Sequence, residues 1–437
     1  MKTKASPHKI GIVSLGCAKN LVDTEVLMRQ LDASSFRVVM DPEEKDRVDT
    51  AIINTCGFIL DAKNESVEMI LRFAKAKQEG HLRFLFVMGC LSERYRQQLS
   101  KELPEVDAFF GVHELDKIIE RVGGHFRKEL LGERMLATPS HYAYLKIAEG
   151  CDRRCSFCAI PFIRGSHIST PIEELVTEAR LLAEKGVKEL IVISQDTTYY
   201  GLDLYKKRRL PELLEKLAGV SGLEWIRLHY TYPDGFPLEL LRVMKRHDNI
   251  CKYIDIPFQH ISSRILESMK RGIDKEQTLD LVSAIRERLP GAVIRTTLIT
   301  GYPGETKKDF EELKEFITQC RFDRLGVFSY SHEEGTGAFP MNDNVPSRIK
   351  QERADALMQI QQEISLELNM EKVGSTLNIL IDRMENGYYV GRTEYDSPEI
   401  DNEVLIKGSR KKLKTGHFYR TKITSAGTFD LFGEITD

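Results

Sequence analysis

Three cysteines with a short, regular spacing are the residues of this chain best suited to chemistry. Cys151, Cys155 and Cys158 form a C-x3-C-x2-C pattern directly after a predicted strand. Cysteine thiolates are the usual ligands of iron–sulfur clusters, which generally take four of them. Because no fourth cysteine lies nearby in the sequence, one iron would stay open. An open iron can chelate the amino and carboxylate groups of S-adenosylmethionine and pass an electron to its sulfonium, so the pattern predicts radical chemistry.

A structural zinc site is the alternative for these thiols. Such a site is normally closed by four ligands. The nearest histidine, His167, lies nine residues beyond Cys158 and lacks the usual ligand spacing. The pattern therefore favours a cluster with an open iron over a zinc ion.

A second set of cysteines is spread over the first ninety residues. Cys17, Cys56 and Cys90 each follow a predicted strand, and each stands next to a glycine. Ligand sites in an open α/β sheet form outside the carboxyl ends of parallel strands, and glycine lets backbone approach a bulky group. A lone cysteine at a strand end is usually a small buried hydrophobe, but three in one register predict a second cluster. Cys251 and Cys320 lack such partners and are predicted to be packing residues.

The elements that must hold the two sets of thiols follow from the apolar pattern. Short apolar runs alternate with helix-like stretches, which predicts a doubly wound α/β domain over residues 8–136. The predicted strands are 10–15, 50–55 and 82–88, and the predicted helices are 21–31, 62–76 and 92–99.

Two further domains are predicted downstream. Six strand–helix units over residues 137–371 indicate an open, partial (β/α)6 barrel that ends in a charged helix over 347–372. Its predicted strands are 144–148, 189–194, 225–230, 253–258, 293–299 and 325–330. Residues 372–437 predict a small all-β barrel, with strands at 376–381, 388–393, 404–407 and 418–424.

Bulk properties limit the class of protein. A chain of 437 residues is long enough for several domains, and a net charge of −3 argues against coating nucleic acid by charge alone. The N-terminus has no signal-peptide pattern, and no apolar run approaches the roughly 18 residues that span a bilayer. We therefore expect a cytoplasmic protein without a membrane partner, in a compartment where eight cysteines stay reduced and are best explained as metal ligands or catalytic groups.

Three weaker candidates follow strands of the partial barrel. Gln195 and Asp196 lie where barrel enzymes place binding residues, so either is predicted to contact the polar groups of the cofactor. Gly301 opens the sequence Gly-Tyr-Pro-Gly-Glu-Thr, which fits equally a tight turn or backbone placed beside the adenosine of the cofactor.

These motifs together resemble a known family. The C-x3-C-x2-C pattern, with the aromatic Phe157 before its last cysteine, resembles the signature of the radical S-adenosylmethionine superfamily. With three upstream cysteines and a terminal β-barrel, the chain resembles the methylthiotransferase family throughout its length. The sequence around Cys17, Ser-Leu-Gly-Cys-Ala-Lys-Asn-Leu-Val-Asp, and residues 391–401 are similar to the RimO-type branch. The tRNA-modifying branch typically has Gly-Cys-Gln-Met-Asn at the position that corresponds to the sequence around Cys17.

The resemblance implies an activity and its cofactors. The chain would methylthiolate the β-carbon of an aspartate in small-subunit ribosomal protein S-twelve. One S-adenosylmethionine would donate the methyl group, and another would give the 5′-deoxyadenosyl radical that removes the hydrogen. The later cysteine set would hold the radical-generating [4Fe-4S] cluster and the earlier set an auxiliary [4Fe-4S] cluster that carries the sulfur. The terminal barrel would be a TRAM domain that contacts the substrate, and flavodoxin or ferredoxin would supply electrons.

Two rival functions stay open. One is a tRNA adenosine methylthiotransferase of the same architecture, and the other is a non-catalytic ribosome-assembly factor that carries a metal cluster. An acidic stretch in the terminal domain argues against the first, because it would attract a basic ribosomal protein and repel RNA phosphates. Its members are Glu394, Asp396, Glu399, Asp401 and Glu403.

Overall fold

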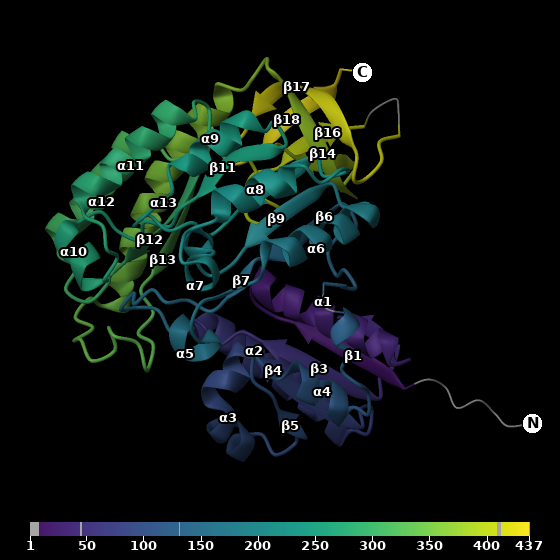
Figure 1. The fold of residues 1–437 in the computed structure, drawn as a ribbon. Helices are drawn as coiled ribbons and strands as arrows, with labels where there is room; N and C mark the ends of the chain where they lie inside the picture. The colour runs from purple at the N-terminus through teal and green to yellow at the C-terminus, as the bar shows by residue number, and fades with distance from the viewer. Residues whose placement is uncertain (1–7, 44–45, 131, 409–411, 437) are drawn as a thin grey trace, which may run out of the picture.

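The N-terminal part is a parallel sheet covered by helices on both faces (Figure 1). The computed structural model describes residues 8–43, 46–130, 132–408 and 412–436. In this range the strand order is β2-β1-β3-β4-β5. The strands are β1 (Lys9–Ser14), β2 (Arg37–Met40), β3 (Thr50–Thr55), β4 (Phe84–Gly89) and β5 (Ala108–Phe109). The helices are α1 (Ala18–Ala33), α2 (Leu60–Gln78), α3 (Cys90–Glu102) and α4 (Leu115–Arg121), and a 3-10 turn, η2 (Lys128–Leu130), follows.

The sequence of β3 explains why this sheet is buried on both sides. All six of its residues are buried, and successive side chains point to opposite faces. Ile53 packs into the apolar cluster under α2 and α3, whereas Ile52 packs into the cluster under α1 and α4. A continuous apolar strand of this kind is typical of parallel sheets.

The central part is a second parallel sheet that stays open at its edges. Its order is β13-β12-β11-β10-β9-β6 in the described residues, which confirms the predicted partial barrel. The strands are β6 (Tyr142–Lys146), β9 (Glu189–Ile193), β10 (Trp225–Leu228), β11 (Ile250–Asp255), β12 (Val293–Thr300) and β13 (Arg324–Ser329). The longer helices are α6 (Ile172–Glu184), α8 (Leu210–Ala218), α9 (Glu239–Arg246), α11 (Lys275–Arg288), α12 (Lys307–Cys320) and the exit helix α13 (Ser347–Met370).

Short elements line the carboxyl ends of these strands. They are β7 (Ala148–Glu149), α5 (Ile160–Arg164), β8 (Ile168–Ser169), η3 (Thr197–Tyr199), α7 (Leu202–Tyr205) and α10 (Ser263–Ser268). Helix α1 of the N-terminal part lies beside this end of the central sheet, where Val22 packs with Tyr144 of β6 and Ile193 of β9 (Figure 1). The two sheets therefore meet through α1.

The terminal part is a closed five-stranded barrel, drawn in yellow in Figure 1. Its order is β14-β15-β16-β18-β17 among the residues described. The strands are β14 (Thr376–Glu385), β15 (Tyr388–Arg392), β16 (Val404–Lys407), β17 (Phe418–Ala426) and β18 (Leu431–Ile435). Inward-facing Ile379, Ile381, Val404, Ile406 and Ile423 are fully buried and form its core.

The predicted fold class is confirmed, but five strands were missed, among them the two-residue strands β7 and β8. β2 is a half-buried edge strand, β5 has two residues, and β18 contains Gly433, so none gives a strong apolar signal. The strand predicted at 253–258 is also misplaced, because β11 begins at Ile250. Lys252, near its start, interrupts the apolar pattern and hides the beginning of the strand.

Two members of the acidic stretch, Asp396 and Asp401, join the terminal domain to the central sheet, which corrects the expectation that the whole stretch faces a partner. Asp396 is 2% exposed and accepts hydrogen bonds from Arg324 of β13. Asp401 accepts from Tyr253 of β11 at 2.6 Å and pairs with Arg295 at 3.3 Å. These carboxylates are neutralised by cations of the central sheet, so they cannot attract a basic protein.

Candidate cluster site at the junction of two sheets

The fold brings Cys17, Cys56 and Cys90 to one edge of the N-terminal sheet. They follow β1, β3 and β4, and these three strands are direct neighbours. Two glycines are required by the close approach of the loops. A Cβ at Gly16 would lie 2.6 Å from the Cβ of Cys56, and one at Gly57 would lie 2.7 Å from the Cα of Leu91.

The later cysteines lie in the loop between β7 and α5. The backbone N–H of Cys151 donates to the carbonyl of Gly165 at 3.0 Å, which closes this loop. The Sγ of Cys155 lies 3.2 Å from the hydroxyl of Tyr232 and accepts a hydrogen bond from Arg271 at 3.3 Å. Tyr232 and Arg271 were missed by the sequence analysis, because neither belongs to a motif.

The segments that carry the two sets of thiols meet at one junction. Cys90 packs in one apolar cluster with Ala159, the residue after Cys158, and with Ile163 of α5. Arg164, also on α5, is 2% exposed and donates to the side chain of Asn20 on α1. The loop that carries one set of cysteines therefore contacts the loops that carry the other.

Burial makes three of these thiols harder to deprotonate. Burial raises the pKa of Cys90 to about 11, that of Cys151 to about 11 and that of Cys158 to about 12. Within each set, the charge of neighbouring thiolates raises the pKa further. A cation such as cluster iron would stabilise these buried thiolates, because metal binding is coupled to the deprotonation of its thiol ligands.

The thiols of the described residues are not arranged around a single metal ion. No group of three or more His, Cys, Asp or Glu side chains in the described ranges is arranged to hold one metal ion. A cubane is larger than an ion, so its thiolate ligands lie farther apart. His167, the candidate zinc ligand, is buried and lies 3.1 Å from the hydroxyl of Ser169 instead.

An ion-pair network lies between the two cysteine sets. Arg164 donates to Asp23 of α1 at 3.1 Å and to Glu149 of β7 at 2.9 Å. Lys146 of β6 pairs with the same two carboxylates. Burial would raise the pKa of Glu149, but these two cations hold it well below its usual range. The network fixes α1 against the central sheet.

Asn20 was also missed, although it belongs to the sequence quoted around Cys17. Its side-chain amide is buried and donates to the carbonyls of Leu15 at 2.9 Å and Thr55 at 3.1 Å. Leu15 directly follows β1, and Thr55 is the last residue of β3. Asn20 therefore fixes the loops that carry Cys17 and Cys56. This role can be recognised only from contacts in the folded protein.

The weaker candidates Gln195, Asp196 and Phe157 all contact other protein groups. Gln195 donates to Glu149 at 2.7 Å, and its Oε1 is buried without a hydrogen-bond partner among the described residues. Asp196 is 1% exposed, pairs with Arg153 at 2.8 Å and caps η3. Its carboxylate oxygens therefore already bond to protein groups. Phe157 packs beside the cluster of Met269 and Tyr302.

Gly301 makes a turn that its surroundings require. Its φ is +72°, and its N–H donates to Glu305 at 2.9 Å. A Cβ there would lie 2.1 Å from the Cγ of Lys350. The turn therefore needs glycine whether or not a cofactor lies beside it. Cys251 and Cys320 are buried in apolar clusters, as expected for packing residues.

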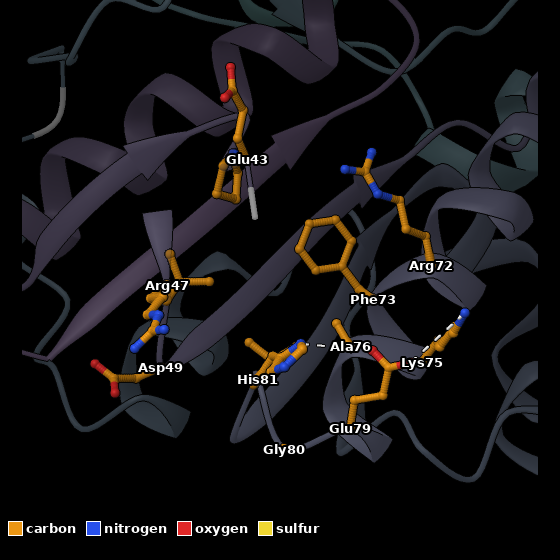
Figure 2. Close-up of a pocket in the computed structure, with 13 residues that line it drawn as sticks. Glu43, Arg47, Asp49, Arg72, Phe73, Lys75, Ala76, Glu79, Gly80 and His81 are labelled. Carbon is orange, nitrogen blue, oxygen red and sulfur yellow. Dashed lines mark ion pairs between the residues drawn. The ribbon is translucent and has the colours of Figure 1, made fainter. Parts of the chain in front are cut away.

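A cavity of about 840 Å³ lies elsewhere (Figure 2). Val48, Asp49 and Leu82, which precede β3 and β4, line it together with Phe73 of α2. It therefore opens at the amino ends of strands whose carboxyl ends carry the cysteines. This cavity is not part of the cysteine site.

Comparisons with known proteins agree with this architecture. Residues 145–317 match the radical SAM superfamily, residues 9–111 match the uncharacterized protein family UPF0004, and residues 373–436 match the TRAM domain. The chain is 57% identical to ribosomal protein uS12 methylthiotransferase RimO of Flavobacterium johnsoniae, over 99% of this chain and 100% of that one. It is 53% identical to the RimO of Cytophaga hutchinsonii over the full length of both. The chain belongs to the RimO family.

More distant structures share the fold of this RimO family member. The radical S-adenosylmethionine methyltransferase TsrM of Kitasatospora setae superimposes with a TM-score of 0.56 at 13% identity, over 88% of this chain and 81% of that one. The cobalamin-dependent enzyme OxsB gives a TM-score of 0.52 at 13% identity, over 82% and 56%. In the described part of the chain, no helix is long and apolar enough to cross a membrane.

Proposed function

We propose that this protein is a radical S-adenosylmethionine methylthiotransferase that modifies the β-carbon of an aspartate in ribosomal protein uS12. The observation that carries this proposal is the meeting of two sets of three cysteines at one domain junction. Full-length relatives more than half identical to the chain bear the name of that activity. A C–H bond on such a carbon is not acidic, so a side-chain base would not remove its hydrogen near neutral pH.

Two [4Fe-4S] clusters are assigned to the two cysteine sets. The N-terminal ligands are Cys17, Cys56 and Cys90, and the central ligands are Cys151, Cys155 and Cys158. Together with S-adenosylmethionine, the bound clusters supply the electron, the carbon radical, the sulfur and the methyl group.

The chain itself contributes positioning. Arg271 and Tyr232 hold the side chain of Cys155, and Asn20 holds the loops of the N-terminal ligands. Burial of Cys56, Cys90 and Cys151 limits the access of water to this junction, which protects a reactive radical.

The binding of S-adenosylmethionine is assigned to the carboxyl ends of the central strands. Gln195 is the best-supported side chain, because its buried Oε1 lacks a partner in the described structure. Phe157, Asp196 and the backbone of Gly301 complete the predicted set, although Asp196 already pairs with Arg153. A reduced flavodoxin or ferredoxin would supply electrons in the cytoplasm, where free thiols persist.

One experiment separates this function from its rivals. Reconstituted enzyme is incubated anaerobically with S-adenosylmethionine, reductant, and either uS12 or unmodified tRNA. We expect an added methylthio mass on an aspartate of uS12 together with 5′-deoxyadenosine. Mass added to a tRNA adenosine instead would indicate the tRNA enzyme. Absence of 5′-deoxyadenosine with iron present would indicate a non-catalytic assembly factor.

A further inference from the structure

Lys19 is a buried lysine that forms no ion pair with an acidic side chain in the described part of the chain. It is the second residue of α1 and is 8% exposed. Its ammonium lies 3.0 Å from the centroid of the Tyr230 ring. Within the residues that the structure describes, its Nζ forms no ion pair and no hydrogen bond. A buried charge without a partner is costly, so such a position suggests a missing anionic ligand.

The carboxylates around Lys19 are already engaged by other groups. Asp255 accepts from the Tyr230 N–H at 2.9 Å and pairs with Arg295 at 3.1 Å. Glu149 is shared by Lys146 and Arg164, and so is Asp23. The positive charge of Lys19 is therefore available to an anion from outside the chain.

The position of Lys19 matches the place where a substrate must lie. It stands two residues after Cys17, and the ring beneath it belongs to Tyr230, which follows β10 of the central sheet. Lys19 therefore bridges the N-terminal part and the central part. Its side chain projects into the junction that both cysteine sets border.

The backbone of Tyr230 adds an independent indication. Its φ is +57°, a left-handed conformation that is unfavourable for an aromatic residue. Its N–H donates to Asp255, and its carbonyl accepts from the N–H of Thr197 at 3.0 Å. Strain of this kind persists where the surroundings enforce it, and it concentrates at ligand sites. The strained turn places the aromatic ring under the ammonium of Lys19.

We propose that Lys19 is a specificity-determining residue whose ammonium binds the side-chain carboxylate of the target aspartate. This inference rests on the proposed function. The carboxylate is one bond from the β-carbon, so anchoring it would fix the reacting carbon between the two cysteine sets. An asparagine at the target position would leave the charge of Lys19 uncompensated. Lys19 thus selects an acidic residue without touching the reacting atom.

The test is a double-mutant cycle between enzyme and substrate. Holoenzyme with S-adenosylmethionine and no reductant is titrated with uS12 that carries Asp or Asn at the modified position. We expect the wild type to bind the Asp form about 10- to 100-fold more tightly, since a charge-assisted hydrogen bond contributes about 1.5–3 kcal/mol. Lys19→Met should bind both forms within about twofold to threefold of each other. Lys19→Gln gives the same comparison if the first variant does not fold.

A matched control removes a lysine charge from the same domain. Lys77 on α2 is partly buried and pairs with Asp107 at 2.6 Å, away from the cysteines. Lys77→Met should keep the full Asp-to-Asn ratio. Iron and sulfide content, measured in every variant, should be unchanged.

Three results would overturn the inference. An unchanged Asp-to-Asn ratio in both Lys19 variants would show that the lysine does not contact the target. Loss of iron would show that it balances the charge of the neighbouring cluster. Weaker binding of S-adenosylhomocysteine would show that it holds the carboxylate of the cofactor. If wild-type enzyme leaves uS12 unmodified, the proposed function fails and this inference fails with it, whereas modification with an unchanged ratio removes the inference alone.

Discussion

Glu189 of β9 and Arg392 of β15 lie 2.8 Å apart, and neither side chain is more than 2% exposed. Glu189 also accepts from Arg227 at 2.7 Å, and Arg392 donates to Asp382 at 2.7 Å. Burial would raise the pKa of Glu189, but Arg392 and Arg227 outweigh it and lower the pKa. This buried network joins the central sheet to the terminal barrel, which is how the barrel keeps its orientation relative to the cysteine site.

Removing the side chain of Arg392 should therefore lower the free energy of unfolding. Loss of one partner of a buried ion pair leaves an uncompensated charge, which costs about 3–5 kcal/mol. We expect Arg392→Met to lower the free energy of unfolding by that amount in urea denaturation followed by circular dichroism. Arg383→Met is the control, since Arg383 pairs with Glu385 and Glu403 on the surface of the same barrel and is 46% exposed. Its loss should cost about 1 kcal/mol or less. Equal losses in both variants would contradict the network's role.

The two-cluster assignment predicts a specific pattern of iron loss. Cys151→Ala and Cys17→Ala should each lose about half of the iron and sulfide after anaerobic reconstitution, because each removes a ligand of one cluster. Only Cys151→Ala should also abolish 5′-deoxyadenosine formation. Cys251→Ala is the control, since this buried cysteine packs with Trp225 and Tyr253 and should keep all the iron. Loss of all iron from either ligand variant would indicate a single shared centre.

The sequence was sufficient for the fold class and the cysteine positions. Cysteines at strand ends carry a local signal, because the apolar strand before each one is visible in the sequence and parallel strands end at one edge. Cys17, Cys56 and Cys90 accordingly follow neighbouring strands. Their role as ligands stays a prediction that the iron measurement tests.

Charge patterns in the sequence were a poorer guide. Asp396 and Asp401 form part of what reads as an acidic surface loop, yet both pair with arginines of strands β12 and β13 that are distant in the sequence. Lys19 reads as an ordinary helical lysine, although it is buried in the junction. Pairing and burial of charges depend on contacts between domains, and local periodicity carries no information about them.

Gly301 allows steric and conformational effects to be separated. Gly301→Ala and Gly304→Ala both place alanine at a positive φ, +72° and +82°, which costs about 1–2 kcal/mol each. Only Gly301→Ala causes a steric clash, because its Cβ would lie 2.1 Å from the side chain of Lys350. The Cβ of Gly304→Ala would have its nearest neighbour, a side-chain atom of Arg264, at 3.7 Å. We expect Gly301→Ala to lose a further 1–3 kcal/mol or so in urea denaturation.

The same pair of variants tests the role of Gly301 in cofactor binding. If its backbone lies beside the adenosine, Gly301→Ala should also bind S-adenosylmethionine more weakly in equilibrium titration, and Gly304→Ala should not. Equal affinity in both variants would leave Gly301 as a turn residue alone.

His229 should make stability depend on pH. It is 3% exposed and lies 2.9 Å from the hydroxyl of Ser397 in the terminal part, and burial lowers its pKa to about 3. An unfolded histidine has a pKa of about 6.5, so between these values the unfolded state binds more protons than the folded state. The contribution of His229 to stability is therefore lost as the pH falls below about 6.5, by roughly 1.4 kcal/mol for each pH unit.

The His229→Gln variant isolates this contribution, because glutamine can still bond to Ser397 but does not titrate. We expect the free energy of unfolding of the variant to fall less steeply between pH 6.5 and about 5 than that of the wild type, by roughly 1.4 kcal/mol per unit. His81→Gln is the control, since the His81 side chain is 75% exposed and should leave the slope unchanged. Parallel pH profiles for wild type and His229→Gln would mean that His229 takes up its proton without unfolding, and that its contact with Ser397 tolerates the charge.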